Sequence, residues 1–103
     1  MLDQKMLDTK ILERINMVID SVTATIPSTT HGTNHVGSTS IEKTGYTPIG
    51  VVGFTWDSGT RQNWFSLYRL YVDATTVNYS MLNMHSTDSA SGVIRFYVLY
   101  LKD

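Results

Sequence analysis

The sequence has no cysteine and only two prolines among its 103 residues. Without cysteine the chain forms no disulfide framework, no thiolate zinc site and no cysteine nucleophile. An excess of charge of one sign is missing too, because eight Lys and Arg stand against nine Asp and Glu, for a formal net charge of -1. No overall field draws such a chain to nucleic acid or to an anionic membrane. We therefore expect neither as a partner.

Long hydrophobic runs are also lacking, since no apolar stretch approaches the roughly 20 residues that span a bilayer. The first residues alternate charged with apolar side chains and do not build a signal-peptide core. What the chain does have is a 42% hydrophobic content with 17% charged residues, which is enough for one packed domain. The sequence predicts a soluble protein with no membrane insertion.

The composition divides the chain into two parts. Residues 1–22 hold seven of the seventeen charged residues but only two of the twenty-four Ser and Thr. The remainder is rich in Ser, Thr, aromatic and β-branched residues, which favour strands. We therefore predict two units: an N-terminal oligomerisation or docking helix over residues 1–22, and an antiparallel β-sandwich head over residues 23–103.

The predicted helix carries one apolar stripe. Its segment contains no Gly or Pro, and its stripe residues recur every three or four positions, as on one face of a helix. The stripe consists of Leu7, Ile11, Ile15, Val18 and Val22. Such a helix either packs on its own domain or joins identical helices of other chains. We favour a short parallel coiled coil, because no second helix follows in the sequence to cover the stripe.

The body reads as short strands separated by turn-forming residues. Alternating β-branched and aromatic residues are broken by Gly, Asp, Asn and Ser, which is typical of antiparallel strands in a sandwich or jelly roll. A polar loop is expected over residues 28–38. The predicted strands cover residues 22–26, 39–43, 48–56, 63–72, 76–85 and 92–101.

The last predicted strand has two apolar faces. Ile94, Phe96, Val98 and Tyr100 make one face, while the other includes Tyr97 and Leu99. A single small sandwich has only one interior, so the second face indicates a subunit interface at Tyr97 and Leu99. Together with the helix, this predicts a homo-oligomer, and a trimer is the closed symmetry that a short coiled coil and small heads share most easily.

A candidate ligand surface lies in the loop between two tryptophans. Trp56 and Trp64 flank a polar segment that contains Asp57 and Arg61. Flat rings surrounded by hydrogen-bonding groups are the chemistry that binds sugars, so these four residues are the predicted ligand-binding set. The alternative is that both indoles fill the core at the ends of strands.

The sequence contains no assembled catalytic motif. No Ser lies in a Gly-x-Ser-x-Gly elbow, and the acidic residues Asp57, Asp73 and Asp88 each fall in a turn. We predict no enzyme activity and no cofactor.

Metal binding is predicted to be absent as well. A site made of His31, His35 and His85 stays open as an alternative, although no Asp or Glu near the first two could orient an imidazole.

Three stretches of the body carry a resemblance to a known family. They are Lys43 to Phe54 (KTGYTPIGVVGF), the aromatic segment Leu67 to Val72 (LYRLYV), and the closing Tyr97 to Lys102 (YVLYLK). With the preceding helix, the chain resembles the C-terminal heads of bacteriophage fibre and tail receptor-binding proteins. The resemblance lies in the residue types and in the order of the segments over residues 2–103, and it identifies no binding residue in this chain.

The resemblance implies a location and a role. Such proteins are commonly trimers with β-sandwich heads, displayed on the virion and used in host attachment. We therefore expect a non-catalytic virion protein, a fibre or tail head, with other virion proteins and a host-surface glycan as partners. The alternative is a capsid decoration or head-fibre protein that binds and stabilises the virion shell.

Overall fold

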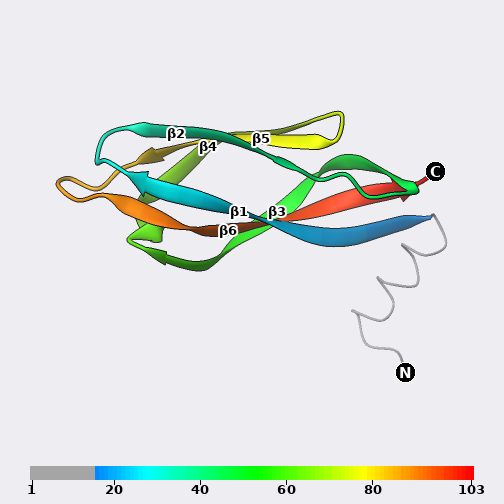
Figure 1. The fold of residues 1–103 in the computed structure, drawn as a ribbon, viewed down its shortest axis with the longest axis horizontal. Helices are drawn as coiled ribbons and strands as arrows, with labels where there is room; N and C mark the ends of the chain where they lie inside the picture. The colour runs from blue at the N-terminus through cyan, green and yellow to red at the C-terminus, as the bar shows by residue number, and fades with distance from the viewer. Residues whose placement is uncertain (1–15) are drawn as a thin grey trace, which may run out of the picture.

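A computed structural model describes residues 16–103 and shows six strands in two facing antiparallel sheets (Figure 1). The first sheet, called sheet I here, has the order β1-β6-β3, and sheet II has the order β2-β5-β4. A single turn of 3-10 helix, η1 (Gln62–Trp64), precedes β4. The strands are β1 (Met17–Thr29), β2 (Asn34–Ser40), β3 (Tyr46–Thr60), β4 (Phe65–Asp73), β5 (Thr76–Asn83) and β6 (Ala90–Lys102). The predicted antiparallel β architecture is confirmed for this part of the chain.

The two central strands supply most of the core. Alternate residues of β6 and of β5 face inward and are almost completely buried, as expected where two sheets pack face to face. The rings of Tyr79 and Phe96 lie 5.3 Å apart across the interior. The inward residues of these two strands are Ile94, Phe96, Val98 and Tyr100 of β6, with Val77, Tyr79 and Met81 of β5.

Two buried polar side chains fasten loops to this core. The Tyr100 hydroxyl donates to the carbonyl of Ile41 at 2.8 Å, which holds the segment after β2. The Asn83 amide donates to the carbonyls of Thr29 and Asp88 at 2.9 and 3.0 Å. Because buried polar groups are costly without partners, these bonds define where the loops at the ends of the sheets lie.

The predicted helix is wrong over residues 17–22, which form the beginning of β1. Val18 and Val22 pair with Tyr100 and Phe96 of β6 and pack against the core. Residues four apart share a face in a strand as well as in a helix, so this spacing does not distinguish the two. The β-branched side chains and the available edge of β6 decide for strand. The predicted stripe residues Leu7, Ile11 and Ile15 lie outside the described residues.

The other predicted strands differ from the observed ones at their ends and in one omission. β2 occupies residues 34–40, most of which were predicted as loop because its sequence, NHVGSTS, is polar. It is an edge strand of sheet II, where polar side chains are compatible with pairing. β3 continues past the predicted end at Trp56 to Thr60, and η1 replaces the predicted start of β4.

Extra residues interrupt the ladders at several points. Strand β3 contains three bulges against β6, between Pro48 and Gly50, Val51 and Gly53, and Trp56 and Ser58. Strand β4 contains one bulge against β5, between Leu67 and Arg69. Each bulge shifts the alternation of inward and outward side chains along its strand. The faces of β3 and β4 therefore do not follow from simple alternation in the sequence.

Candidate interaction surfaces

Trp56, the first member of the predicted ligand loop, is half-buried and packs against the core. It pairs with Ile94 on the inner face of sheet I, and its indole stacks on Phe65 with ring centroids 5.6 Å apart. A Cβ added at Gly92 would lie 2.9 Å from the Trp56 ring, so the indole also covers the β6 backbone. This position agrees with the alternative interpretation, in which the indole packs inside the sandwich.

Asp57 is held by an arginine from the neighbouring strand. Its carboxylate accepts hydrogen bonds from Arg95, at 3.1 Å from Nε and 2.7 Å from Nη2. Nη1 of Arg95 donates to the Ser21 hydroxyl at 2.7 Å, which joins all three strands of sheet I. The Arg95 guanidinium holds the pKa of Asp57 below its ordinary value. The bidentate pair occupies the Asp57 oxygens on the outer face of this sheet.

Arg61 and Trp64 lie where β3 turns into β4. Nε of Arg61 donates to the carbonyl of Ser89 at 2.7 Å, so this side chain ties the turn to the loop before β6. The Trp64 indole is 49% exposed and meets His85 edge to face, with ring centroids 4.9 Å apart. Trp64 is the more exposed of the two predicted ligand indoles, and each of the four predicted residues contacts a partner outside the set.

The three histidines take different positions. His31 is exposed in the turn before β2, and His35 lies beside the Tyr79 ring, where burial lowers its pKa. Nδ1 of His85 accepts hydrogen bonds from the backbone N–H groups of Thr87 and Asp88. In residues 16–103, no three His, Asp or Glu side chains are grouped as a metal site requires.

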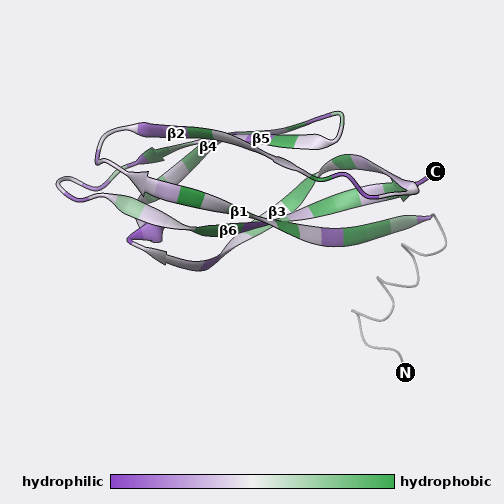
Figure 2. Ribbon diagram, viewed as in Figure 1, coloured by the Kyte–Doolittle hydropathy of each residue, from purple (hydrophilic) through white to green (hydrophobic). Residues whose placement is uncertain are grey.

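The outer face of sheet I carries an apolar patch at the end where β1 starts and β6 finishes. Met17, Ile19 and Ser21 of β1 are the direct partners of Leu101, Leu99 and Tyr97 of β6. Ile19 is 48% exposed, and Figure 2 shows hydrophobic colour over this part of β1 and β6. We call the exposed and half-exposed group Ile19, Tyr97, Leu99 and Leu101 the β6 patch.

Strand β3 borders the β6 patch with glycines. Gly50 and Gly53 pair with Leu99 and Tyr97, and nothing lies within 4 Å of where a Cβ would stand at either position. The bulge residues Ile49 and Val52 beside them are exposed. One edge of the patch is thus bare backbone, with room for a side chain from another molecule, next to exposed aliphatic groups.

Of the predicted interface residues, Tyr97 and Leu99 lie on this surface, whereas Val18 and Val22 lie inside the sandwich. Ile19 was missed because residues 1–22 were assigned to a helix. The odd-numbered positions Met17, Ile19 and Ser21 become one face only when the segment is a strand.

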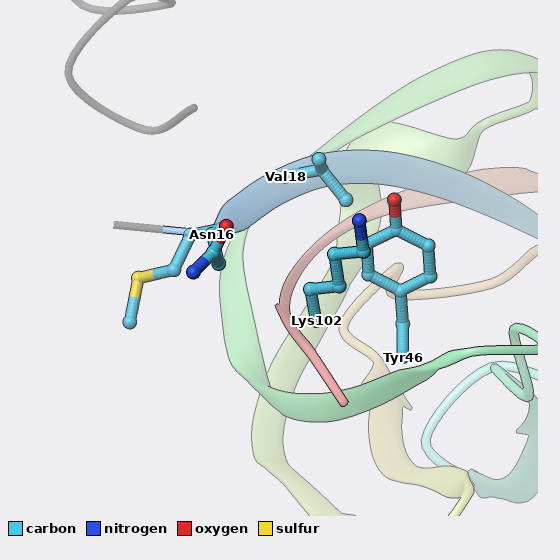
Figure 3. A pocket seen from close by; sticks show the side chains of 5 residues that line it. Asn16, Val18, Tyr46 and Lys102 are labelled. Atoms are coloured by element: carbon cyan, nitrogen blue, oxygen red, sulfur yellow. The ribbon is translucent and has the colours of Figure 1, made fainter. Parts of the chain in front are cut away.

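A shallow hollow lies at the same end of sheet I, over the inner side. It has a volume of about 180 Å³ and is lined by Asn16, Met17, Val18, Tyr46 and Lys102 (Figure 3). Tyr46 and Lys102 are partners across β3 and β6, and the Lys102 N–H donates to the Asn16 carbonyl at 2.7 Å. An ammonium and a phenol without an acid or a nucleophile give the hollow no evident catalytic chemistry.

A second, more open hollow of about 370 Å³ lies at the opposite end, against residues 25–28 of β1. Its other walls are Ser58 and Gly59 of β3 and residues 91–93 of β6. The lining offers hydroxyls and backbone groups but no titratable side chain.

Sheet II also has an outer face that the sequence did not reveal correctly. Simple alternation along the strand would place Arg69 and Tyr71 on the same face as Phe65 and Leu67. The bulge at Tyr68 breaks this pattern, so Phe65 and Leu67 pack against the core while Arg69 and Tyr71 face outward. The faces of β4 could not be assigned from the sequence because its pattern does not show that Tyr68 is an unpaired residue.

Comparison with protein-family models, with curated proteins and with solved structures found no match to this chain. The residues that the structure describes include no helix with the length and hydrophobicity needed to cross a bilayer.

Proposed function

We propose that this chain is a non-catalytic virion protein, the β-sandwich head of a trimeric phage fibre or tail protein that attaches to the host surface. The observation that carries the proposal is the β6 patch. Strand β6 buries one apolar face in the core and presents a second one, with Tyr97 and Leu99, on the outside of sheet I. A monomer gains nothing from this second face, whereas an oligomer removes it from water.

A threefold arrangement fits the placement of the patch. Each chain offers one such face, and three copies around an axis can turn these faces toward one another. Gly50 and Gly53 leave room beside the patch for a neighbour's side chain. The patch lies at the end of sheet I where β1 begins, so the predicted coiled coil with Leu7, Ile11 and Ile15 would precede the head on the same axis.

Such an assembly would leave the other side of each head available. Sheet II is on the far side of the sandwich from the β6 patch, so its outer face would point away from the axis (Figure 1). A fibre head needs this geometry, because the surface that joins the copies cannot also contact the host. The resemblance of the sequence to phage fibre heads supports the same assignment.

The oligomeric state tests the basis of the proposal. Sedimentation equilibrium of the full chain, at concentrations of roughly 1 to 100 µM, should give three times the mass of one chain, as expected for a specific assembly. Ile19→Asp combined with Leu99→Asp should shift the mass to that of one chain. Val36→Asp is the matched control, because Val36 is 72% exposed on sheet II. A wild-type chain that stays monomeric would contradict the proposal.

The attachment role needs a separate measurement. Fluorescently labelled trimer should adsorb to intact cells of some bacteria in a panel, and the monomeric variant should adsorb less because it loses multivalency. Binding to empty capsids, with protection of those capsids from heat, and no adsorption to cells would instead favour the capsid decoration alternative.

A further inference from the structure

The outer face of β4 gathers three large side chains over four consecutive positions. Leu67 pairs with Met81 and Arg69 with Ser80, so Tyr68 is the extra residue of a bulge. Leu67 packs on the core, and both Tyr68 and Arg69 are exposed, with Leu70 returning to the interior. Tyr71 then faces outward as well. Tyr68 is 55% exposed and Tyr71 44%, so two aromatic rings and a guanidinium stand together in solvent.

This arrangement is a property of the bulge and not of regular strand geometry. In an unbroken ladder, two adjacent residues point to opposite faces. The bulge interrupts pairing with β5 and brings Tyr68 and Arg69 to the same side. Bulges often re-aim side chains beside functional sites. About half of each tyrosine stays exposed to water, so packing within the fold accounts for only part of their surface.

Arg69 is held in place but its charge is not neutralised. Its guanidinium carbon lies 5.1 Å from the centre of the Tyr71 ring, a cation–π contact. The other two arginines in residues 16–103 are paired with carboxylates, Arg61 with Asp88 and Arg95 with Asp57, whereas no ion pair in that range includes Arg69. Asp73 follows on the same face, beyond Tyr71. The guanidinium fork is thus available to an outside carboxylate.

The neighbouring positions on β5 are small and polar. Ser80 lies opposite Arg69 but is only 5% exposed, whereas Asn78 is half-buried and lies opposite Tyr71. Exposed rings that carry phenol hydroxyls, next to the amide of Asn78, match a saccharide, whose C–H face stacks on an aromatic ring while its hydroxyls form hydrogen bonds. The unpaired guanidinium adds a preference for an acidic sugar, because Arg binds carboxylate with two parallel hydrogen bonds.

We propose that Tyr68, Arg69 and Tyr71 form a binding site for a carboxylate-bearing saccharide on the outer face of sheet II. This inference rests on the proposed function, since it names the host chemistry that the attachment head would contact. Arg69 binds the carboxylate, Tyr71 orients the guanidinium, and Tyr68 offers a ring for stacking. The site differs from the Trp56–Trp64 loop and from the β6 patch.

The test is saccharide binding by the full chain, measured by saturation-transfer NMR and by titration calorimetry. Trigalacturonate is compared with galactotriose, and sialyllactose with lactose, so that each acidic sugar has a neutral counterpart and uronic and sialic acids are distinguished. We expect binding of at least one acidic sugar and a loss of at least tenfold on removal of its charge. Failure of both acidic sugars to bind would overturn the proposal.

Variants assign the binding to these residues. Arg69→Gln and Tyr71→Ala should each weaken binding at least tenfold, and Arg69→Lys should weaken it less than Arg69→Gln because it keeps the charge but loses the fork. Deletion of Tyr68 should also weaken binding, and it restores regular alternation with Arg69 and Tyr71 still outward. Circular dichroism and urea unfolding confirm that each variant is folded; all substituted side chains are exposed.

Control variants separate this site from its alternatives. Arg61→Gln and Trp64→Ala should leave binding unchanged; a loss in these variants, with none in Arg69→Gln, would move the site to the Trp56–Trp64 loop and overturn the proposal. If the chain is a trimer that adsorbs to cells with Arg69→Gln and Tyr71→Ala unaffected, the saccharide site fails while the proposed function stands, and the partner is then of another class. A monomer that adsorbs to nothing removes the proposed function itself.

Discussion

At the scale of single residues, buried polar side chains fix the positions of the chain segments to which they are hydrogen-bonded. Asn83 is fully buried, donates to one carbonyl at the end of β1 and to one in the loop before β6, and accepts a hydrogen bond from the backbone N–H of His85 at 2.9 Å. No apolar residue could replace it without leaving those groups unpaired. Its place at the end of β5 explains why both loops close at this end of the sandwich.

Asn83→Ala should therefore be strongly destabilising. The lost bonds leave buried carbonyl groups without donors, at roughly 1–3 kcal/mol for each unsatisfied group, so we expect a loss of about 3 kcal/mol in the free energy of unfolding. Urea denaturation measures it. Asn78→Ala, on the outer side of the same strand, is the control and should change the stability by less than about 1 kcal/mol. Equal effects of the two substitutions would contradict the role of Asn83.

The ion pair between Asp57 and Arg95 makes a prediction about pH. Because Arg95 lowers the pKa of Asp57 in the folded state, the pair stabilises the fold above the ordinary carboxyl pKa of about 3.9. That contribution is lost as the pH falls through the lower, folded-state pKa.

Carbon-detected NMR titration of the Asp57 carboxyl should thus show a pKa that rises toward its ordinary value in Arg95→Gln. Arg61→Gln is the control and should leave the Asp57 pKa in place. The stability difference between wild type and Arg95→Gln should shrink on acidification, and a difference that grows as the pH falls would show that another group is responsible.

At the scale of elements, β2 is a strand because of what it lies against. Its sequence is polar and contains Gly37, yet it pairs with β5 along its whole length. The Tyr79 ring covers Gly37, and a Cβ there would stand 2.6 Å from the ring. This kind of aromatic cover compensates a glycine in an edge strand.

Gly37→Ala should accordingly disturb the packing of β2 on β5. Tyr79 is buried against Phe96 and cannot move away freely, so we expect a loss of roughly 1–3 kcal/mol, as for other overpacked sites. Ser38→Ala is the matched control, since Ser38 is the exposed neighbour of Gly37 on the same strand. Chemical denaturation compares the two, and a neutral Gly37→Ala would show that the ring adapts.

How far the sequence predicts these elements depends on the regularity of each strand. β6 alternates without interruption, so its core face and its outer Tyr97 and Leu99 were correctly identified from the sequence. Residues 17–22 were misassigned because spacings of four fit both periods. The outer face of β4 could not be found, because a bulge at Tyr68 leaves no mark in a pattern of apolar and polar residues.

The same reasoning applies to the predicted loop site. Turn residues and two tryptophans were recognisable, but whether an indole points inward depends on strand register. Trp56 lies on the inner face because it pairs with Ile94, a relation set by two bulges earlier in β3. Trp64 lies in the 3-10 turn, where alternation does not apply.

At the scale of the whole molecule, the two sheets have opposite tasks in the proposed assembly. Sheet I would join copies through the β6 patch, and sheet II would face outward. If folding and assembly are linked in this way, the thermal midpoint of wild type should rise with protein concentration, because association stabilises the folded state.

Differential scanning calorimetry over a hundredfold range of concentration checks this expectation. The Ile19→Asp and Leu99→Asp double variant should have a midpoint independent of concentration, and Val36→Asp should behave as wild type. A concentration-independent midpoint in wild type would show that the heads are stable without one another.

The three bulges of β3 have a consequence for how copies can meet. β3 is an edge strand of fifteen residues, and a regular edge of that length is a template on which another chain can add a strand and start a fibrous aggregate. The bulges interrupt its row of free N–H and C=O groups at three points, and Pro48 removes one donor. Growth along this edge is hindered, so in the proposed assembly the copies would associate through a face, which closes after a few subunits.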